Sequence, residues 1–182
     1  MQYTYPHTIV NTLGEKLSFL HVEQEPDGDK LIVENLVAPG IGPSMHTHFK
    51  QDESLTVVKG TMGYQILGQE ARYAQTGESV VFERGTPHRF WNAGDNVLQC
   101  TGWIKPANSI VFFLSTLYDA MNKTGANRPE LFDGAYLMWR YKSEYDLPEM
   151  PGFVKKVVMP VVYFIGQLAG KYKKFEGAPK PI

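Results

Sequence analysis

The sequence has little of what several classes of protein require. It holds a single cysteine, Cys100, which excludes an intrachain disulfide and a thiolate zinc cluster. Eighteen basic side chains stand against nineteen acidic ones, so the formal charge is −1 and nucleic acid is not an expected partner. The sequence shows no repeat of solenoid length and no low-complexity tract, which excludes repeat architectures. Its high apolar and aromatic content argues against disorder.

Long hydrophobic runs are also missing. The longest charge-free apolar stretch near the C-terminus covers residues 157–170, and Pro160 and Gly166 interrupt it. Because a membrane-spanning helix needs roughly 20 apolar residues, we expect none. The N-terminus lacks a basic start followed by an apolar stretch, so we expect no signal peptide and a cytoplasmic location.

The chain nevertheless has enough material for one ordinary folded domain. It has 182 residues, of which 43% are hydrophobic, and it contains ten Phe, ten Tyr and three Trp. From about residue 16 to residue 104 it reads as short β segments separated by turn residues. The segments 16–24 and 30–38 flank Pro26-Asp27-Gly28-Asp29, a hairpin signal. Many short strands without intervening helices predict an all-β core, either an antiparallel sandwich or a barrel.

After Pro106 the pattern becomes helical. Asn108 is expected to cap a first helix over residues 109–123, and Pro129 is expected to lie in the first turn of a second helix that extends to residue 145. Pro160 is expected to begin a third helix. One side of that helix would carry apolar residues, namely Val161, Phe164, Ile165, Leu168 and Tyr172.

The C-terminal part is both basic and apolar. From Pro151 onward there are six Lys and one Glu, or +5, which leaves −6 for residues 1–150. Such a helix could lie in an anionic membrane interface. It could also pack on the β core or on a second subunit, with lysines extended at the rim, and this second interpretation is the one we favour here.

Three histidines and a glutamate have the spacing of metal ligands. On a strand, side chains two residues apart point to the same face, so His46 and His48 can converge on one ion. After a short turn, Glu53 shares a face with Leu55 and Val57, which places its carboxylate at the edge of an apolar interior. A metal ion would compensate for that burial.

A second segment completes the set. Gly85 allows a tight turn, after which His88, Phe90 and Asn92 point to one side of the returning strand. Three imidazoles and one carboxylate suit one divalent transition metal ion, such as Fe, Mn, Ni, Zn, Co or Cu, and leave two octahedral positions open. His7 and His21 lack such neighbours and are expected to be surface or hydrogen-bonded core residues.

The two segments resemble the two motifs of the cupin superfamily. Gly40, His46, His48, Glu53 and Gly60 match the first motif, G-x5-H-x-H-x3-4-E-x6-G. The second motif is G-x5-P-x-G-x2-H-x3-N, and its matching positions are Gly77, Gly85, His88 and Asn92. Glu83 stands where the family has proline, which affects the local turn and not the ligand set.

The resemblance implies an antiparallel jelly-roll β-barrel with the metal in its mouth, and often a homodimer formed through outer strands. We therefore expect a cupin barrel over residues 1–106 and a helical C-terminal extension over residues 107–182, packed on the barrel or on a dimer partner.

The open metal positions and the resemblance together predict a mononuclear metal-dependent enzyme, an oxidoreductase of dioxygenase-like type or an isomerase, that acts on a small oxygenated organic molecule. Phe90 and Tyr64 are candidate substrate contacts, with ordinary core packing as the alternative. Two other functions stay open, a binding or sensing module for a small-molecule ligand and a structural homodimer in which the metal only stiffens the fold.

Overall fold

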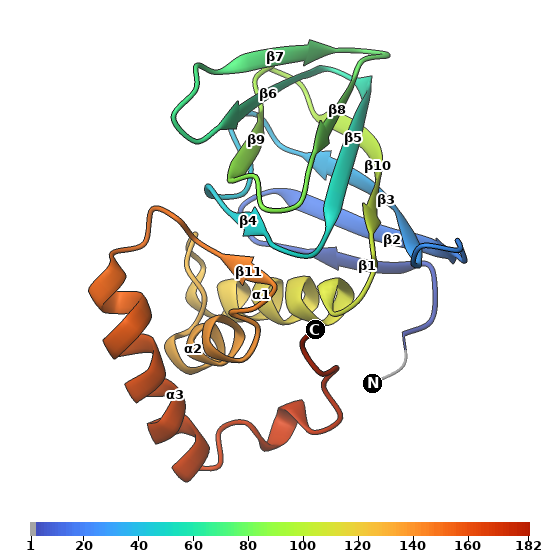
Figure 1. Cartoon of the computed structure of the whole chain (residues 1–182). Coiled ribbons are helices and arrows are strands. Elements are labelled where there is room, and N and C mark those ends of the chain that lie inside the picture. Colours follow the sequence, from blue (N-terminus) through green and yellow to red (C-terminus); the bar gives the residue numbers. More distant parts are fainter. Residues whose placement is uncertain (1–2) are drawn as a thin grey trace.

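A six-stranded antiparallel sheet forms one side of the β core. The computed structural model describes residues 3–182. The strands of this sheet are β1 (His7–Val10), β2 (Glu15–Glu23), β3 (Lys30–Val37), β5 (Asp52–Lys59), β8 (Ser79–Phe82) and β10 (Leu98–Lys105). Their order is β1-β2-β3-β10-β5-β8, so β10 comes back between β3 and β5 (Figure 1). Distant parts of the chain thus become neighbours in the centre of the sheet.

Two smaller sheets complete the β structure. The first contains β6 (Thr61–Ile66), β7 (Arg72–Gln75) and β9 (His88–Asn92) in the order β7-β6-β9. The second pairs β4 (Thr47–His48) with β11 (Tyr145–Asp146), a short strand within the helical part.

The predicted antiparallel β core followed by a helical C-terminal part is confirmed. Among the described strands, the hydrogen-bonded ladders form three sheets and not one closed sheet, so full closure of the barrel stays a prediction. The predicted hairpin is formed by β2 and β3, and Gly28 in its turn has a φ of +131°, a conformation that glycine adopts without strain.

The helical part contains α1 (Ile110–Thr124), α2 (Leu131–Arg140) and α3 (Met159–Leu168). A π-helical segment, η1 (Val154–Val158), leads directly into α3, and a 3₁₀ turn, η2 (Lys173–Phe175), follows it. Figure 1 shows α1 beneath the strands, α2 beside α1, and α3 on the outer side of α2, away from the β core. The prediction that Pro160 stands at the start of the third helix is confirmed, although helical structure begins earlier.

Two predicted helix starts and one predicted end are wrong. The N-cap of α1 is Ser109, because Asn108 has a φ of +45° and its amide lies 3.4 Å from a carboxyl oxygen of Glu144 instead. The N-cap of α2 is Glu130, whose carboxylate accepts hydrogen bonds from the backbone N–H groups of Phe132 and Asp133. This helix ends at Arg140, well before the predicted residue 145, because the chain turns there to bring Tyr145 into β11.

Apolar side chains gather in three clusters. One lies where the large sheet meets α1 and includes Leu31, Val33 and Ile110. Another includes residues of both larger sheets, among them Val57, Met62 and Phe82. The third joins α1 and α2 to the C-terminal segment through Phe112, Tyr136, Tyr141, Tyr172 and Phe175. The helical part is therefore joined to the β core through continuous apolar packing.

Gly102 shows how closely the central strands approach one another. A Cβ atom at this position would lie 2.1 Å from the backbone oxygen of Ser54 on β5. We expect Gly102→Ala to lower the free energy of unfolding by about 1–3 kcal/mol, because the backbone of β5 must move. A Cβ at Gly94 would lie 3.6 Å from its nearest neighbour, so Gly94→Ala is the matched control. Urea titration measures both, and equal midpoints for the two variants would contradict this description.

Candidate metal centre

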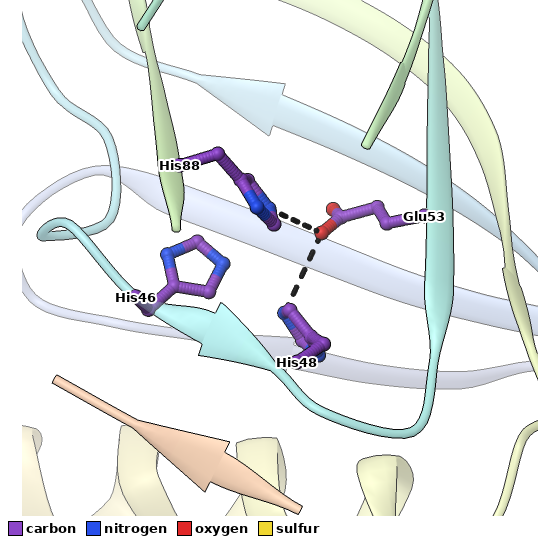
Figure 2. Close-up of side chains that lie close together, drawn as sticks. All are labelled: His46, His48, Glu53 and His88. Atoms are coloured by element: carbon purple, nitrogen blue, oxygen red, sulfur yellow. Dashed lines mark hydrogen bonds and ion pairs between the residues drawn. The ribbon is translucent and has the colours of Figure 1, made fainter. Parts of the chain in front are cut away.

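The structure brings together the four side chains that the sequence singles out. His48 belongs to β4, Glu53 lies near the start of β5, and His88 begins β9. His46 precedes β4 and forms an isolated antiparallel bridge with His88, in which each backbone N–H donates to the other residue's carbonyl. Figure 2 shows the four side chains directed toward one centre.

The spacing of the donor atoms suits a metal ion. One ligand atom from each residue can be chosen so that all four lie within 4.8 Å of one another. The Oε2 atom of Glu53 is 3.2 Å from Nε2 of His88 and 3.5 Å from Nε2 of His48. With metal–ligand bonds of about 2.0–2.2 Å, neighbouring octahedral ligands lie about 3 Å apart and opposite ones about 4.2 Å apart. Small side-chain movements would therefore bring all four onto one ion.

Backbone carbonyls orient two of the imidazoles. Nδ1 of His46 lies 2.8 Å from the carbonyl oxygen of Ser44, and Nδ1 of His88 lies 2.8 Å from that of Thr86. With Nδ1 donating to each carbonyl, Nε2 is the ring nitrogen that faces the centre, and on metal binding Nε2 of His88 would exchange its hydrogen bond to Glu53 for a bond to the ion. Nδ1 of His48 is buried and has no hydrogen-bond partner among the described residues.

Burial sets the charges of the site. It lowers the pKa of His46 to about 3 and that of His48 to about 4, and repulsion between the protonated imidazoles acts in the same direction. Burial alone would raise the pKa of Glu53, but the hydrogen bond from His88 and the charges of the histidines outweigh it and lower this pKa to about 2. At neutral pH the site thus offers neutral imidazoles from His46 and His48 beside an ionised carboxylate. This donor set is suited to binding a metal cation.

The metal-free protein is expected to lose stability as the pH falls below about 6.5. The unfolded chain protonates His46 and His48 near their ordinary pKa of 6.5, whereas the folded chain resists protonation until pH 3 to 4. Each histidine then lowers the free energy of unfolding by up to about 1.4 kcal/mol per pH unit. For the two histidines together the loss between pH 6.5 and pH 5 is at most about 4 kcal/mol. Glu53, with its lowered pKa, adds to the loss only below its ordinary pKa of 4.5.

Urea unfolding of the metal-free protein between pH 7.5 and pH 5 measures this dependence. The His48→Asn variant should show about half the slope, and the exposed His21→Asn should leave it unchanged. Equal stability of the wild type at pH 5 and pH 7 would show that the imidazoles are not held neutral by burial.

Aromatic side chains surround the four groups. The ring of Phe82 stacks on His88 with centroids 4.0 Å apart, a contact that the sequence analysis missed. Strand alternation from Val80 could have placed Phe82 inside. Phe90, a predicted substrate contact, is buried in the same apolar cluster as Phe82, and Tyr64 packs against that cluster with its ring 6.2 Å from Phe82.

The helical part also reaches the site. Tyr145 on β11 pairs with His48 in register, and the centroids of their rings lie 5.4 Å apart at nearly right angles. The preceding residue, Glu144, is fully buried and accepts hydrogen bonds from Gln51 and Ser109. Neither contact could be predicted from the sequence, because a two-residue strand inside a helical region has no periodicity to detect.

The remaining histidines lie apart from this cluster, as expected. Nε2 of His7 is 3.1 Å from the hydroxyl of Ser115, and His21 is exposed beside Glu23. Within residues 3–182, the four residues in Figure 2 are the one group of this kind with metal-ligand spacing.

Comparison with known proteins identifies a domain family for the part of the chain that holds the four candidate ligands. Residues 34–103 match the model of the family described as "Cupin domain", and this segment holds all four candidate ligands. One curated relative, the protein named Oxidoreductase iacF of Pestalotiopsis fici, is 32% identical over 91 residues. That match covers 45% of this chain and 45% of the relative, so the chain spans less than half of the relative's length.

Similar solved structures include KdgF from Halomonas sp., at 20% identity and a TM-score of 0.46, covering 54% of this chain and 84% of that one. A cupin-like protein of Thermotoga maritima is 22% identical, with a TM-score of 0.46, and the match covers 51% of this chain and 69% of that one. Together with the two motifs and the antiparallel β core, the match of residues 34–103 gives the assignment. This match identifies residues 34–103 as a cupin domain.

Proposed function

We propose that the protein binds one divalent transition metal ion through His46, His48, Glu53 and His88, and that it is a mononuclear metal-dependent enzyme. The observation that carries this proposal is the convergence of four donor atoms within 4.8 Å in a largely buried setting. The ion would be Fe, Mn, Ni, Zn, Co or Cu, since three imidazoles and one carboxylate suit all of them.

We further propose a reaction of the oxygenase type on a small oxygenated organic molecule. When bound, the ion would supply Lewis acidity and, if it is iron or copper, redox chemistry at the two positions that the protein leaves open. The chain itself supplies the surroundings. The Glu53 carboxylate balances part of the ionic charge, and the rings of Phe82 and Phe90 keep water from one side of the cluster.

Tyr64 and Phe90 are proposed to contact the apolar part of the substrate. Phe90 is 4% exposed, and Tyr64 is half-buried on the neighbouring strand, where it pairs with Phe90 in register. Movement of these two rings would give a ligand access to the interior. The relative from Pestalotiopsis fici is named an oxidoreductase. For the 91 residues that the two proteins share, this name supports the proposal of an oxidation or reduction reaction.

The proposal is tested by turnover. The protein loaded separately with Fe(II), Mn(II), Ni(II) or Zn(II) is mixed with diketones, catechols, thiols and sugars, and oxygen uptake and product formation are followed. We expect turnover with at least one metal, and loss of it in Glu53→Gln but not in the exposed variant Glu149→Gln. Turnover that Glu53→Gln retains in full would refute the assignment.

A binding or sensing module is the second candidate, and the exposed apolar surface of α3 favours it. In that case metal-loaded protein would bind a small molecule without converting it, and substitutions on α3 would remove partner association. A homodimer formed through outer strands fits either function. If the metal is only structural, its removal lowers the melting temperature and changes no ligand binding.

A further inference from the structure

One side of η1 and α3 carries large apolar side chains that stay about half exposed or more, although the ring of Phe164 contacts Trp139 of α2. Six residues form this α3 outer face, and their exposed fractions are Phe153 68%, Val157 44%, Val161 52%, Phe164 52%, Ile165 53% and Leu168 90%. They recur every three or four residues, so they form one stripe along η1 and α3. The side that packs on α2 carries Gly166, which lies close to Phe132, and Tyr163, whose ring contacts Tyr136 and Trp139.

Exposed apolar residues also occur on the strands, for example Val81 at 55%. What distinguishes the α3 outer face is that all six of its residues lie within one helical segment, residues 153–168. The sequence analysis favoured packing of the third helix on the β core or on a second subunit. In the structure the helix packs on α2, on the side of α2 away from the β core (Figure 1). Val161, Phe164, Ile165 and Leu168 are each more than half exposed. A contiguous exposed apolar stripe of this kind marks an interaction surface.

Positive charge is concentrated at both ends of the α3 outer face. Residues 157–170 contain no charged side chain, whereas Lys155 and Lys156 precede them and Lys171, Lys173 and Lys174 follow. Lys155 and Lys174 are paired with Asp146 and Asp133. The other three lysines are exposed, and Glu176 is the only acidic residue after Pro151. Both ends of the stripe therefore carry exposed lysines, although Asp133 and Glu130 of the neighbouring segment also act on Tyr172 at the C-terminal end.

This combination argues against a second copy of the chain as the occupant. Two copies facing each other through the stripe, parallel or antiparallel, would bring lysine ends against lysine ends. The stripe also has six large side chains, whereas a stable protein interface involves about 20–30 residues on each side. Self-association through this face would be both small and repulsive.

An anionic lipid surface satisfies both features at once. Apolar side chains of a helix that lies in the interface enter the boundary between headgroups and acyl chains, and flanking lysines reach lipid phosphates. None of the helices in residues 3–182 is long and apolar enough to cross a bilayer. A helix of this kind would therefore lie on the surface.

We propose that the α3 outer face docks the protein on membrane surfaces that contain anionic lipid, with α3 parallel to the surface. The interaction goes beyond the proposed metal chemistry and does not depend on it, because the face holds none of the four candidate ligands. It would hold the cupin domain next to the bilayer through α2 and β11.

Vesicle flotation of the full chain tests the proposal. The probes are vesicles of phosphatidylcholine alone and of equimolar phosphatidylcholine and phosphatidylglycerol. We expect binding to the anionic vesicles, at least 10-fold weaker binding to the neutral ones, and release by high salt. Leu168→Asp and Phe164→Asp should each reduce binding at least 10-fold. Val81→Asp, at a position 55% exposed on β8, is the matched control and should leave binding unchanged.

The charged ends are tested separately. Combined Lys156→Glu, Lys171→Glu and Lys173→Glu substitutions should reduce binding to anionic vesicles at least 10-fold, whereas the exposed Lys16→Glu should change it less than twofold. Melting curves establish that every variant is folded. The proposal is overturned if the wild type does not float with anionic vesicles, or if Leu168→Asp floats equally well. It is also overturned if sedimentation shows a dimer that Leu168→Asp dissociates while lipid binding is absent, since the occupant would then be a second copy.

Discussion

Replacement of His88 by alanine is expected to lower the affinity for divalent transition metal ions at least about 100-fold. In the proposed centre His88 is a ligand, and its Nε2 lies 3.2 Å from a carboxylate oxygen of Glu53. Its ring is oriented by the carbonyl of Thr86 and by Phe82. Loss of partners outside the ligand sphere already costs 10–100-fold in affinity, so loss of a ligand should cost more. Calorimetric titration with Zn(II) and Ni(II) measures the effect.

Two control variants separate the loss of a metal ligand from misfolding. His88→Gln retains most of the volume beside Phe82, which His88→Ala would leave partly empty. His21→Ala removes an exposed histidine of β2, remote from the centre, and should bind metal as the wild type does. If His88→Gln, correctly folded, binds metal with unchanged affinity, then His88 is not a ligand.

Replacement of Glu144 by alanine is expected to lower the free energy of unfolding by about 3 kcal/mol or more. This carboxyl is fully buried and lies 3.0 Å from Nε2 of Gln51, 2.7 Å from the hydroxyl of Ser109 and 3.2 Å from the backbone N of Ile182. Each of these groups donates to it, and both side-chain donors are themselves buried. Without Glu144, Gln51 and Ser109 would share the Tyr145 hydroxyl as their remaining partner, so the lost hydrogen bonds of these buried groups should cost about 1–3 kcal/mol each.

Chemical denaturation of Glu144→Ala and of the exposed control Glu149→Ala measures this difference. Because Glu144 precedes the β11 residue that packs on His48, metal affinity should also fall in Glu144→Ala but not in the control. A change below 0.5 kcal/mol would mean that water replaces the lost acceptor and that the network does not hold the helical part on the β core.

The four candidate ligands could be predicted because strand alternation is a local rule. His46 and His48 are two residues apart, and Glu53 shares the inward face of β5 with Leu55 and Val57 as expected. Likewise, His88, Phe90 and Asn92 are all buried on β9, with exposed or half-buried residues between them. Residue spacing therefore carried most of the information about the centre.

What could not be predicted depends on contacts between distant segments. Tyr145 reaches His48 only because α2 ends at Arg140 and the chain turns back to pair with β4. The wrong cap at Asn108 has a similar origin, since its side chain lies next to Glu144, 36 residues further along the chain. On α3 the apolar stripe was visible in the sequence, but its exposure depends on which side of the helix α2 covers.

The most direct test of this account is an anomalous difference map from crystals of the protein loaded with Zn(II) or Co(II). The account predicts one strong peak, about 2.0–2.2 Å from Nε2 of His46, His48 and His88 and from a carboxylate oxygen of Glu53. A peak bound elsewhere, or these four side chains hydrogen-bonded to one another around a centre without anomalous signal, would contradict it.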